Sequence, residues 1–395
     1  MNHKSLNILI LTNRIPFPLN DGGNIAIYYM VKFLTERGHQ VQMLSFNTKK
    51  HYQEVGVLDG ICQLEAVELD NSVSLVGILK GVFQSQPYYI QRFDSGEYRE
   101  KLTELLQSEK FDIVQTETIY MGMFAEQVKK ESMAKLVLRA HNIENLIWSR
   151  LSQNSINPIK KIYYKYLSKR IKSFEESQAK LYDRVIPITE TDAAFYKSFL
   201  NEQKVTSIPA GIDFCNYTKY HKKSKKNTIC FLGSLEWQPN IEGLQWFLKS
   251  VWTKLIKLNK SVQFHIAGKN PPQFLLDIKQ ERVKMHGMVK DAMEFLSNYE
   301  ILVVPLLSGS GMRLKVIEAM AVKKCIVSTS IGAEGIAVGK DELVLVDDAN
   351  KMAFMINELL QNESKRMRLR ENAFSFVQKH YDWNNLIAQF EAAYQ

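Results

Sequence analysis

Residues 306–321, LLSGSGMRLKVIEAMA, combine glycines, cations and a carboxylate at the start of an expected helix. The glycines permit a nest of backbone N–H donors, and Arg313 and Lys315 add two positive charges beside it. Cations at a helix N-terminus oppose the helix dipole, so this arrangement indicates that an anion binds there. We therefore expect a diphosphate site that contains Gly311, Met312, Arg313 and Lys315.

Two neighbouring features extend this expected site. Glu318 lies three residues after Lys315, close to one helical turn on, where its carboxylate can accept hydrogen bonds from the two hydroxyls of a ribose. Gly233 and Ser234 end the first strand of the second half, in FLGSLEWQPN, and can let a phosphate approach the backbone. We assign Gly233 and Ser234 to diphosphate binding and Glu318 to ribose binding.

The first half of the chain offers its own candidates. Gly22 and Gly23 immediately precede a helix, so we expect their amides to be open to an anion or a sugar hydroxyl, and we add them to the diphosphate set. His141 ends the strand KLVLRAH and is the expected catalytic residue. No two aspartates lie two residues apart, so the sequence predicts no metal and no cofactor.

The elements that position these residues are strands alternating with helical patterns. Apolar strand-like runs occur at 6–13, 41–46, 111–116, 135–141 and 183–189, and again at 227–234, 262–269, 301–307, 324–330 and 342–348. Strand–helix–strand spacing of this kind is typical of a doubly wound parallel sheet. We predict an α/β protein with two Rossmann-like domains at 1–210 and 211–375, followed by a C-terminal helix within 376–395. Ligands of such sheets bind at the carboxyl ends of the strands, so we expect a cleft between the domains.

Length, composition and charge narrow the class of protein. The 395 residues exceed one hydrophobic core, and 45% apolar with 24% charged residues is an ordinary globular balance. No apolar run is long enough to cross a bilayer, the N-terminus lacks a signal-peptide cleavage site, and the four cysteines fit reduced core residues. These features predict a cytoplasmic enzyme.

The net charge of +9 is concentrated in two segments. Residues 159–173 hold six Lys or Arg and no acid, with lysines 161, 165, 169 and 172 on one helical face and an apolar stripe on another. This helix is a candidate for peripheral docking to an anionic membrane. A solvated helix face is the alternative, and for the second cluster, 221–227, we favour a flexible linker.

Taken together, these motifs resemble the retaining glycosyltransferases of the GT-B fold, group 1 (family 4), of the kind that builds bacterial polysaccharides. The resemblance covers FLGSLEWQPN, GMVKD, the 306–321 segment and STSIGAEGI, and in the first half DGG, RAHNIEN, ITETD and SIPAGID. It implies an N-terminal acceptor domain, a C-terminal domain for a UDP- or GDP-sugar, and a last helix that crosses back to the first domain. It also implies a glycan or lipid-linked acceptor, with His141 orienting the transferred sugar.

Two departures from the family pattern are present. The motif of two glutamates separated by seven residues has Glu318 as its second member, but Ser310 stands at the first position, so sugar specificity is not carried over. The cation that often follows the Gly233 position is also missing, since Glu236 and Trp237 stand there.

Two other functions stay open. A GT-B-fold nucleotide-sugar 2-epimerase would need acid/base carboxylates, for which Glu117, Glu144 and Glu190 are candidates. A polyanion- or nucleic-acid-binding protein would explain the positive charge but not the glycine loop, and we expect no nucleic-acid partner. The missing G-x-G-x-x-G fingerprint disfavours a dehydrogenase.

Overall fold

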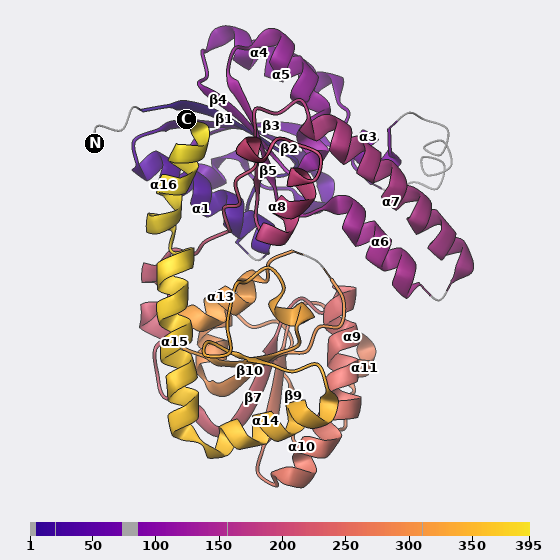
Figure 1. The fold of residues 1–395 in the computed structure, drawn as a ribbon, viewed down its shortest axis with the longest axis vertical. Helices are drawn as coiled ribbons and strands as arrows, with labels where there is room; N and C mark the ends of the chain where they lie inside the picture. Colours follow the sequence, from indigo (N-terminus) through magenta and orange to yellow (C-terminus); the bar gives the residue numbers. More distant parts are fainter. Residues whose placement is uncertain (1–4, 20, 73–85, 156, 310) are drawn as a thin grey trace. The chain divides into compact units, whose positions relative to one another are not determined.

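The computed structural model describes residues 5–19, 21–72, 86–155, 157–309 and 311–395 (Figure 1). The chain forms two compact units. The first contains Met1–Ala210 together with Leu386–Gln395, and the second contains Gly211–Asn385.

The first unit is built on a six-stranded parallel sheet in the order β3-β2-β1-β4-β5-β6. Its strands are β1 (Asn7–Thr12), β2 (Gln40–Thr48), β3 (Gln63–Leu69), β4 (Ile113–Glu117), β5 (Lys135–Ala140) and β6 (Arg184–Pro187). Its longer helices are α1 (Gly22–Glu36), α4 (Gly96–Ser108), α5 (Ala125–Glu131), α6 (Glu144–Asn154), α7 (Pro158–Ala179) and α8 (Glu190–Lys197), and α3 (Tyr88–Gln91) is a single turn. The central strands are almost fully buried because helices cover both faces of the sheet.

The second unit repeats this architecture, with strands in the order β12-β11-β10-β7-β8-β9. Its strands are β7 (Lys225–Leu232), β8 (Gln263–Ala267), β9 (Val283–Met285), β10 (Tyr299–Val304), β11 (Cys325–Ser328) and β12 (Val344–Leu345). Its helices are α9 (Gln238–Trp246), α10 (Thr253–Leu258), α11 (Gln273–Leu276), α12 (Ala292–Ser297), α13 (Leu314–Ala321), α14 (Ala349–Gln361) and α15 (Glu363–Tyr381), and a π-helix (Phe247–Trp252) joins α9 to α10.

Both sheets reverse their strand order at one place. If each sheet is numbered from its own first strand, the order is 3-2-1-4-5-6, and the direction changes between β1 and β4 and between β7 and β10. Such switch points leave a crevice at the carboxyl ends of the strands, where α/β proteins bind ligands. The fold therefore predicts a site beside the ends of β1 and β4 in one unit and of β7 and β10 in the other.

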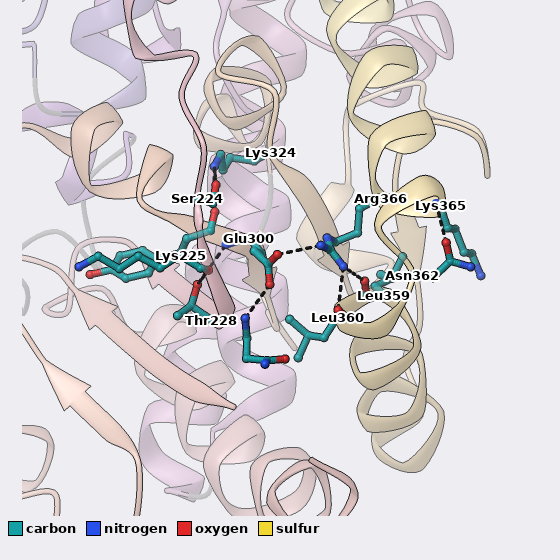
Figure 2. Close-up of polar contacts among 12 residues, drawn as sticks. Ser224, Lys225, Thr228, Glu300, Lys324, Leu359, Leu360, Asn362, Lys365 and Arg366 are labelled. Carbon is teal, nitrogen blue, oxygen red and sulfur yellow. Dashed lines mark hydrogen bonds and ion pairs between the residues drawn. The ribbon is translucent and has the colours of Figure 1, made fainter. Parts of the chain in front are cut away.

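The helix α15 is anchored to the second sheet by a buried ion pair. Arg366 Nη2 lies 2.7 Å from Glu300 Oε1, and Arg366 also donates to the carbonyls of Leu359 and Leu360 at the end of α14 (Figure 2). The second carboxylate oxygen of Glu300 accepts the backbone N–H of Asn227 at 2.8 Å. Because both charges are paired and hydrogen-bonded, burial of this pair is tolerated and fixes the turn between α14 and α15.

The last helix, α16 (Trp383–Tyr394), begins in the second unit, and its residues from Leu386 onward belong to the first. At its start the Trp383 amide donates to the carbonyl of Ile212 at 3.2 Å. The expected segment 376–395 is divided differently, because α15 continues unbroken to Tyr381.

The basic helix expected at 159–173 is part of α7, which packs against α6 as a helical hairpin (Figure 1). The four lysines at 161, 165, 169 and 172 are all exposed. The expected apolar stripe is not exposed. Leu167, Ile171 and Phe174 are buried in the first unit and are not available to a membrane. The exposed apolar side chains of α7 are instead Ile159 and Ile162, which are 78% and 72% exposed.

Within the described ranges, the helices include none that is long and apolar enough to cross a membrane. The four cysteines are free, but the expectation that they are core residues is wrong for two of them. Cys230 and Cys325 are buried, whereas Cys215 is exposed and Cys62 is half-buried, because both lie in connecting segments outside the strands.

Candidate functional site

In the second unit, the loop after β10 carries the cations predicted from the sequence. Gly309 and Gly311 adopt φ angles of 115° and 79°, in the left-handed region that favours glycine, and the loop enters α13 at Leu314. The apolar residues of α13 are buried against the unit's core, which leaves Lys315 and Glu318 on the partly exposed side. Met312 lies in the same loop and is partly buried. Ser310 lies outside the described residues.

Lys315 reaches across the switch point to the turn that follows β7. Its Nζ lies 3.1 Å from Asn240 Oδ1, and Asn240 Nδ2 donates to the Ser234 carbonyl at 2.8 Å. A Cβ on Gly233 would lie 2.9 Å from Asn240 Nδ2 and 3.2 Å from Lys315 Nζ, so any larger residue here would displace the ends of these two side chains. The structure thus brings Lys315 of one predicted loop beside the Gly233–Ser234 turn of the other.

The electrostatic setting of Lys315 favours an anion. Burial, and to a smaller extent the positive charge of Arg313, lowers the pKa of Lys315 to about 7. Arg313 is itself buried, and its guanidinium lies 5.2 Å from the centre of the Trp237 ring. Two cations held together at the start of a helix repel each other and the helix dipole, and a bound diphosphate would relieve both effects.

Glu318 lies one turn further along α13, as predicted. Its Oε1 accepts a hydrogen bond of 2.9 Å from the hydroxyl of Tyr217, between two short 3-10 helices, Phe214–Asn216 and Thr218–Tyr220. Burial raises the pKa of Glu318 to about 7. A carboxylate so placed can accept hydrogen bonds from vicinal hydroxyls of a nucleoside, whose contacts would compensate its burial.

In the first unit, His141 follows β5 directly, beside the end of β4. Its Nε2 lies 2.5 Å from Glu117 Oε2, and Glu117 is the last residue of β4. His141 is 9% exposed and Glu117 is fully buried. A histidine held by a buried carboxylate has a fixed ring orientation, which suits a residue that positions a substrate.

The expectation of open amides at Gly22 and Gly23 is wrong for Gly23. Asp21 caps α1, and its Oδ1 accepts the amides of Gly23 and Asn24 at 3.0 and 3.1 Å. The same oxygen accepts Arg14 Nη2 at 2.7 Å. An anion would therefore have to displace a carboxylate from the Gly23 amide, and both glycines belong to the first unit rather than to the one that holds Lys315.

Four residues that surround these groups were not assigned to the site from the sequence: Trp237, Asn240, Tyr217 and, as the partner of His141, Glu117. A signal for Asn240 was present, since an asparagine occupies the first turn of the helix after the first strand in both halves. Asn24 Nδ2 donates to the Pro18 carbonyl at 3.0 Å much as Asn240 does to Ser234. Nothing in the local pattern marks Tyr217, whose contact with Glu318 joins segments about 100 residues apart.

The three carboxylates considered for an epimerase each have different surroundings. Glu117 is engaged by His141, and Glu190 is exposed in the first turn of α8. Glu144 accepts the Tyr120 hydroxyl at 2.9 Å, and burial raises its pKa to about 7. In the described ranges, no group of three or more His, Cys, Asp or Glu side chains is placed to hold a metal ion.

Comparison with known proteins defines the class. A family model described as Glycosyltransferase Family 4 matches residues 20–214, and one described as Glycosyl transferases group 1 matches residues 226–362. Sucrose-phosphate synthase from Thermosynechococcus elongatus has the same fold, with a TM-score of 0.73 at 16% identity over 98% of each chain. HepE from Anabaena in complex with UDP matches with a TM-score of 0.66 at 14% identity, over 98% of this chain and 99% of that one. The two units are thus the two Rossmann-like halves of a GT-B glycosyltransferase.

The chain belongs to the group 1 (family 4) glycosyltransferases. A relative of nearly the same length is an uncharacterized 44.6 kDa protein in the cps region of Klebsiella pneumoniae. The two are 26% identical over 388 residues, which cover 95% of this chain and 96% of the relative.

Proposed function

We propose that this glycosyltransferase takes a sugar from a UDP- or GDP-sugar and transfers it, with retention of anomeric configuration and without a metal ion, to a glycan or lipid-linked acceptor. The observation that carries the proposal is the approach of Lys315 to the Gly233–Ser234 turn at the switch point of the second sheet, with the buried Arg313 against Trp237 in the same loop. HepE, which shares the fold, was solved with UDP and with UDP-glucose. The family membership favours this reading over the epimerase and the polyanion-binding alternatives.

In this proposal the second unit binds the donor. The diphosphate lies against Lys315, Arg313 and the first amides of α13, and Glu318 accepts the ribose hydroxyls. As the bond between the sugar and the diphosphate breaks, negative charge grows on the leaving oxygen, and these cations stabilise it in place of a metal. The acceptor hydroxyl attacks from the face that the diphosphate leaves, a phosphate oxygen of the donor takes the hydroxyl proton, and His141 orients the transferred sugar.

The acceptor belongs to the first unit in this proposal, and we infer that α7 brings the protein to an anionic membrane on its cytoplasmic side. Four exposed lysines line α7, and Ile159 and Ile162 expose most of their side chains near its start. Each cation close to an anionic surface contributes about 1 kcal/mol of attraction, so several would give reversible, salt-sensitive docking. The cps-region relative supports an acceptor that is a growing polysaccharide.

A thermal-shift screen against UDP, GDP, ADP and their sugars tests the donor proposal. A nucleotide at one hundred times its dissociation constant should stabilise the protein by about 2.7 kcal/mol. The anomeric configuration of the product, read by NMR, tests the retaining mechanism. If no nucleotide raises the melting temperature, the donor site is refuted, and an inverted product refutes retention alone.

A further inference from the structure

Beneath the strand ends of the first unit, a chain of buried side chains runs from the last helix to His141. The Tyr394 hydroxyl donates to Gln115 Oε1 at 2.7 Å, and Gln115 Nε2 donates to Glu117 Oε1 at 2.6 Å. Glu117 Oε2 lies 2.5 Å from His141 Nε2. Tyr394 is in the last turn of α16, so this chain of side chains joins α16 to the end of β5. Figure 1 labels both elements.

The donors and acceptors along this chain have only one consistent order. Gln115 must present its oxygen to the tyrosine if its amide nitrogen is to reach Glu117, because a carboxylate only accepts hydrogen bonds. With Oε1 of Glu117 taken by the amide, its Oε2 accepts from His141, so Nε2 carries a proton. The order therefore fixes both the tautomer and the ring orientation of His141, and leaves Nδ1 as the nitrogen for a substrate.

The chain is buried along its length, which makes it sensitive to single atoms. Gln115 and Glu117 are fully buried, and Tyr394 is 4% exposed. Arg139, which is buried on β5, supplies a positive charge to the same region, and its guanidinium lies 4.9 Å from the centre of the Phe390 ring on α16. A buried carboxylate of this kind is stable only while its hydrogen-bond donors stay in place.

The end of α16 is itself held firmly. Glu391 forms an ion pair of 2.8 Å with Arg37 and lies 3.3 Å from His39 Nε2. Lys135 Nζ donates to the carbonyl of Gln395 at 2.6 Å. These contacts lie on either side of Tyr394 in the sequence and restrict the movement of its hydroxyl relative to Gln115.

We propose that Tyr394, Gln115 and Glu117 are positioning residues, through which the last turn of the chain sets the tautomer and orientation of His141 during sugar transfer. The inference rests on the role proposed above for His141. A merely structural role for the three residues would affect the stability of the unit without coupling to the histidine.

A double-mutant cycle tests this proposal. Tyr394→Phe removes one hydroxyl, and we expect it to lower kcat about three- to tenfold with the KM for the nucleotide sugar unchanged. Glu117→Gln, which cannot accept from both neighbours, should lower kcat about a hundredfold. In a His141→Ala background, Tyr394→Phe should have no further effect, because the residue it positions is gone. Equal effects of Tyr394→Phe in both backgrounds would overturn the proposal.

Tyr182→Phe is the matched control. The Tyr182 hydroxyl is also fully buried and lies 2.8 Å from Thr116 Oγ1, on the residue between Gln115 and Glu117. Removing it deletes a similar hydrogen bond to the same strand but does not touch the chain. We expect loss of stability in this variant with kcat unchanged, and a fall in kcat matching that of Tyr394→Phe would overturn the specific role of the chain.

Nitrogen-15 NMR of the His141 ring separates this inference from the proposed function. In the free protein the ring should show the Nε2–H tautomer, and Glu117→Gln should abolish that preference even if no sugar donor is ever found. A wild-type ring in the Nδ1–H form overturns the inference while leaving nucleotide binding intact. Conversely, the Nε2–H form together with full activity of His141→Ala would refute the catalytic role of His141 and, with it, the positioning role.

Discussion

Replacing Lys315 with methionine should stabilise the empty protein and weaken nucleotide binding. The pKa of this lysine falls from an ordinary 10.5 to about 7, which corresponds to an unfavourable free energy on the order of 4–5 kcal/mol for the charged form at neutral pH. Methionine removes this penalty but leaves the Asn240 side-chain oxygen without its donor, at a cost of about 1–3 kcal/mol. We expect a net gain of about 1–3 kcal/mol, or several degrees in the melting temperature of the second unit.

The pH dependence of this gain has a definite sign. Between pH 7 and 10.5 the unfolded state binds more protons at this lysine than the folded state, so the wild-type protein gains stability as the pH rises through that range. The advantage of Lys315→Met should therefore be full below about pH 7 and disappear near pH 10.5. Differential scanning calorimetry across this range measures it.

The affinity for a nucleotide should fall as the pH rises, whereas the stability of the wild-type protein increases. A diphosphate favours the charged lysine, so binding above pH 7 takes up a proton and weakens by up to about tenfold per pH unit. Isothermal titration calorimetry in two buffers of different ionisation enthalpy counts this proton. In Lys315→Met the proton uptake should vanish and affinity fall about ten- to a hundredfold.

Lys351→Met, at an exposed position in the first turn of α14, is the matched control and should change neither property. The reasoning is refuted if Lys315→Met melts earlier than the wild type at pH 7 and still binds UDP or GDP with unchanged affinity.

Four further outcomes are expected. Glu318→Ala should weaken binding of nucleosides and nucleoside diphosphates by a similar factor, because it removes a ribose contact, whereas an effect on diphosphates alone would contradict that assignment. Gly243→Ala should lower the melting temperature, since its Cβ would lie 2.4 Å from the Pro305 carbonyl oxygen, while Gly96→Ala, with no neighbour within 4 Å, serves as the control. Sugar transfer should survive EDTA, because protein cations face the leaving diphosphate, and activity lost to EDTA and restored by a divalent metal would exclude a metal-free mechanism. Co-sedimentation with anionic liposomes at low salt should be lost at high salt and in a variant with lysines 161, 165, 169 and 172 changed to Glu, and equal sedimentation of variant and wild type would count against docking through α7.

The sequence predicted ten of the strands because each carries an apolar run. The other two, β3 and β9, lie at the edges of their sheets, where one side of the strand is unpaired and polar residues replace the apolar pattern. Periodicity detects burial, so the edge strands β6 and β12 were predicted from the apolar runs around them. The partly buried β3 and the three-residue β9 lack such a run and were missed.

The residues of the candidate site also fall into two groups, those that the sequence indicates and those that only the fold brings to the site. Arg313, Lys315 and Glu318 were found because they follow one another on a single loop and helix. Tyr217 and Asn240 contact them from other segments, and such contacts depend on how the chain folds back on itself. The N-cap of α1 is a second feature that the sequence did not reveal. Asp21 stands next to the glycine pair, but only the structure shows that its side chain accepts the Gly23 amide.

The division of α16 between the two units has a consequence for how the protein is made. The sheet of the first unit is complete within the first 210 residues, but Phe390, Glu391 and Tyr394 are synthesised only after the second unit. While the ribosome translates the second unit, the surfaces around Arg139 and Gln115 must remain without these partners. The first unit therefore reaches its final form only after the second unit has been synthesised, and early termination anywhere in the second unit yields a first unit that lacks part of its core.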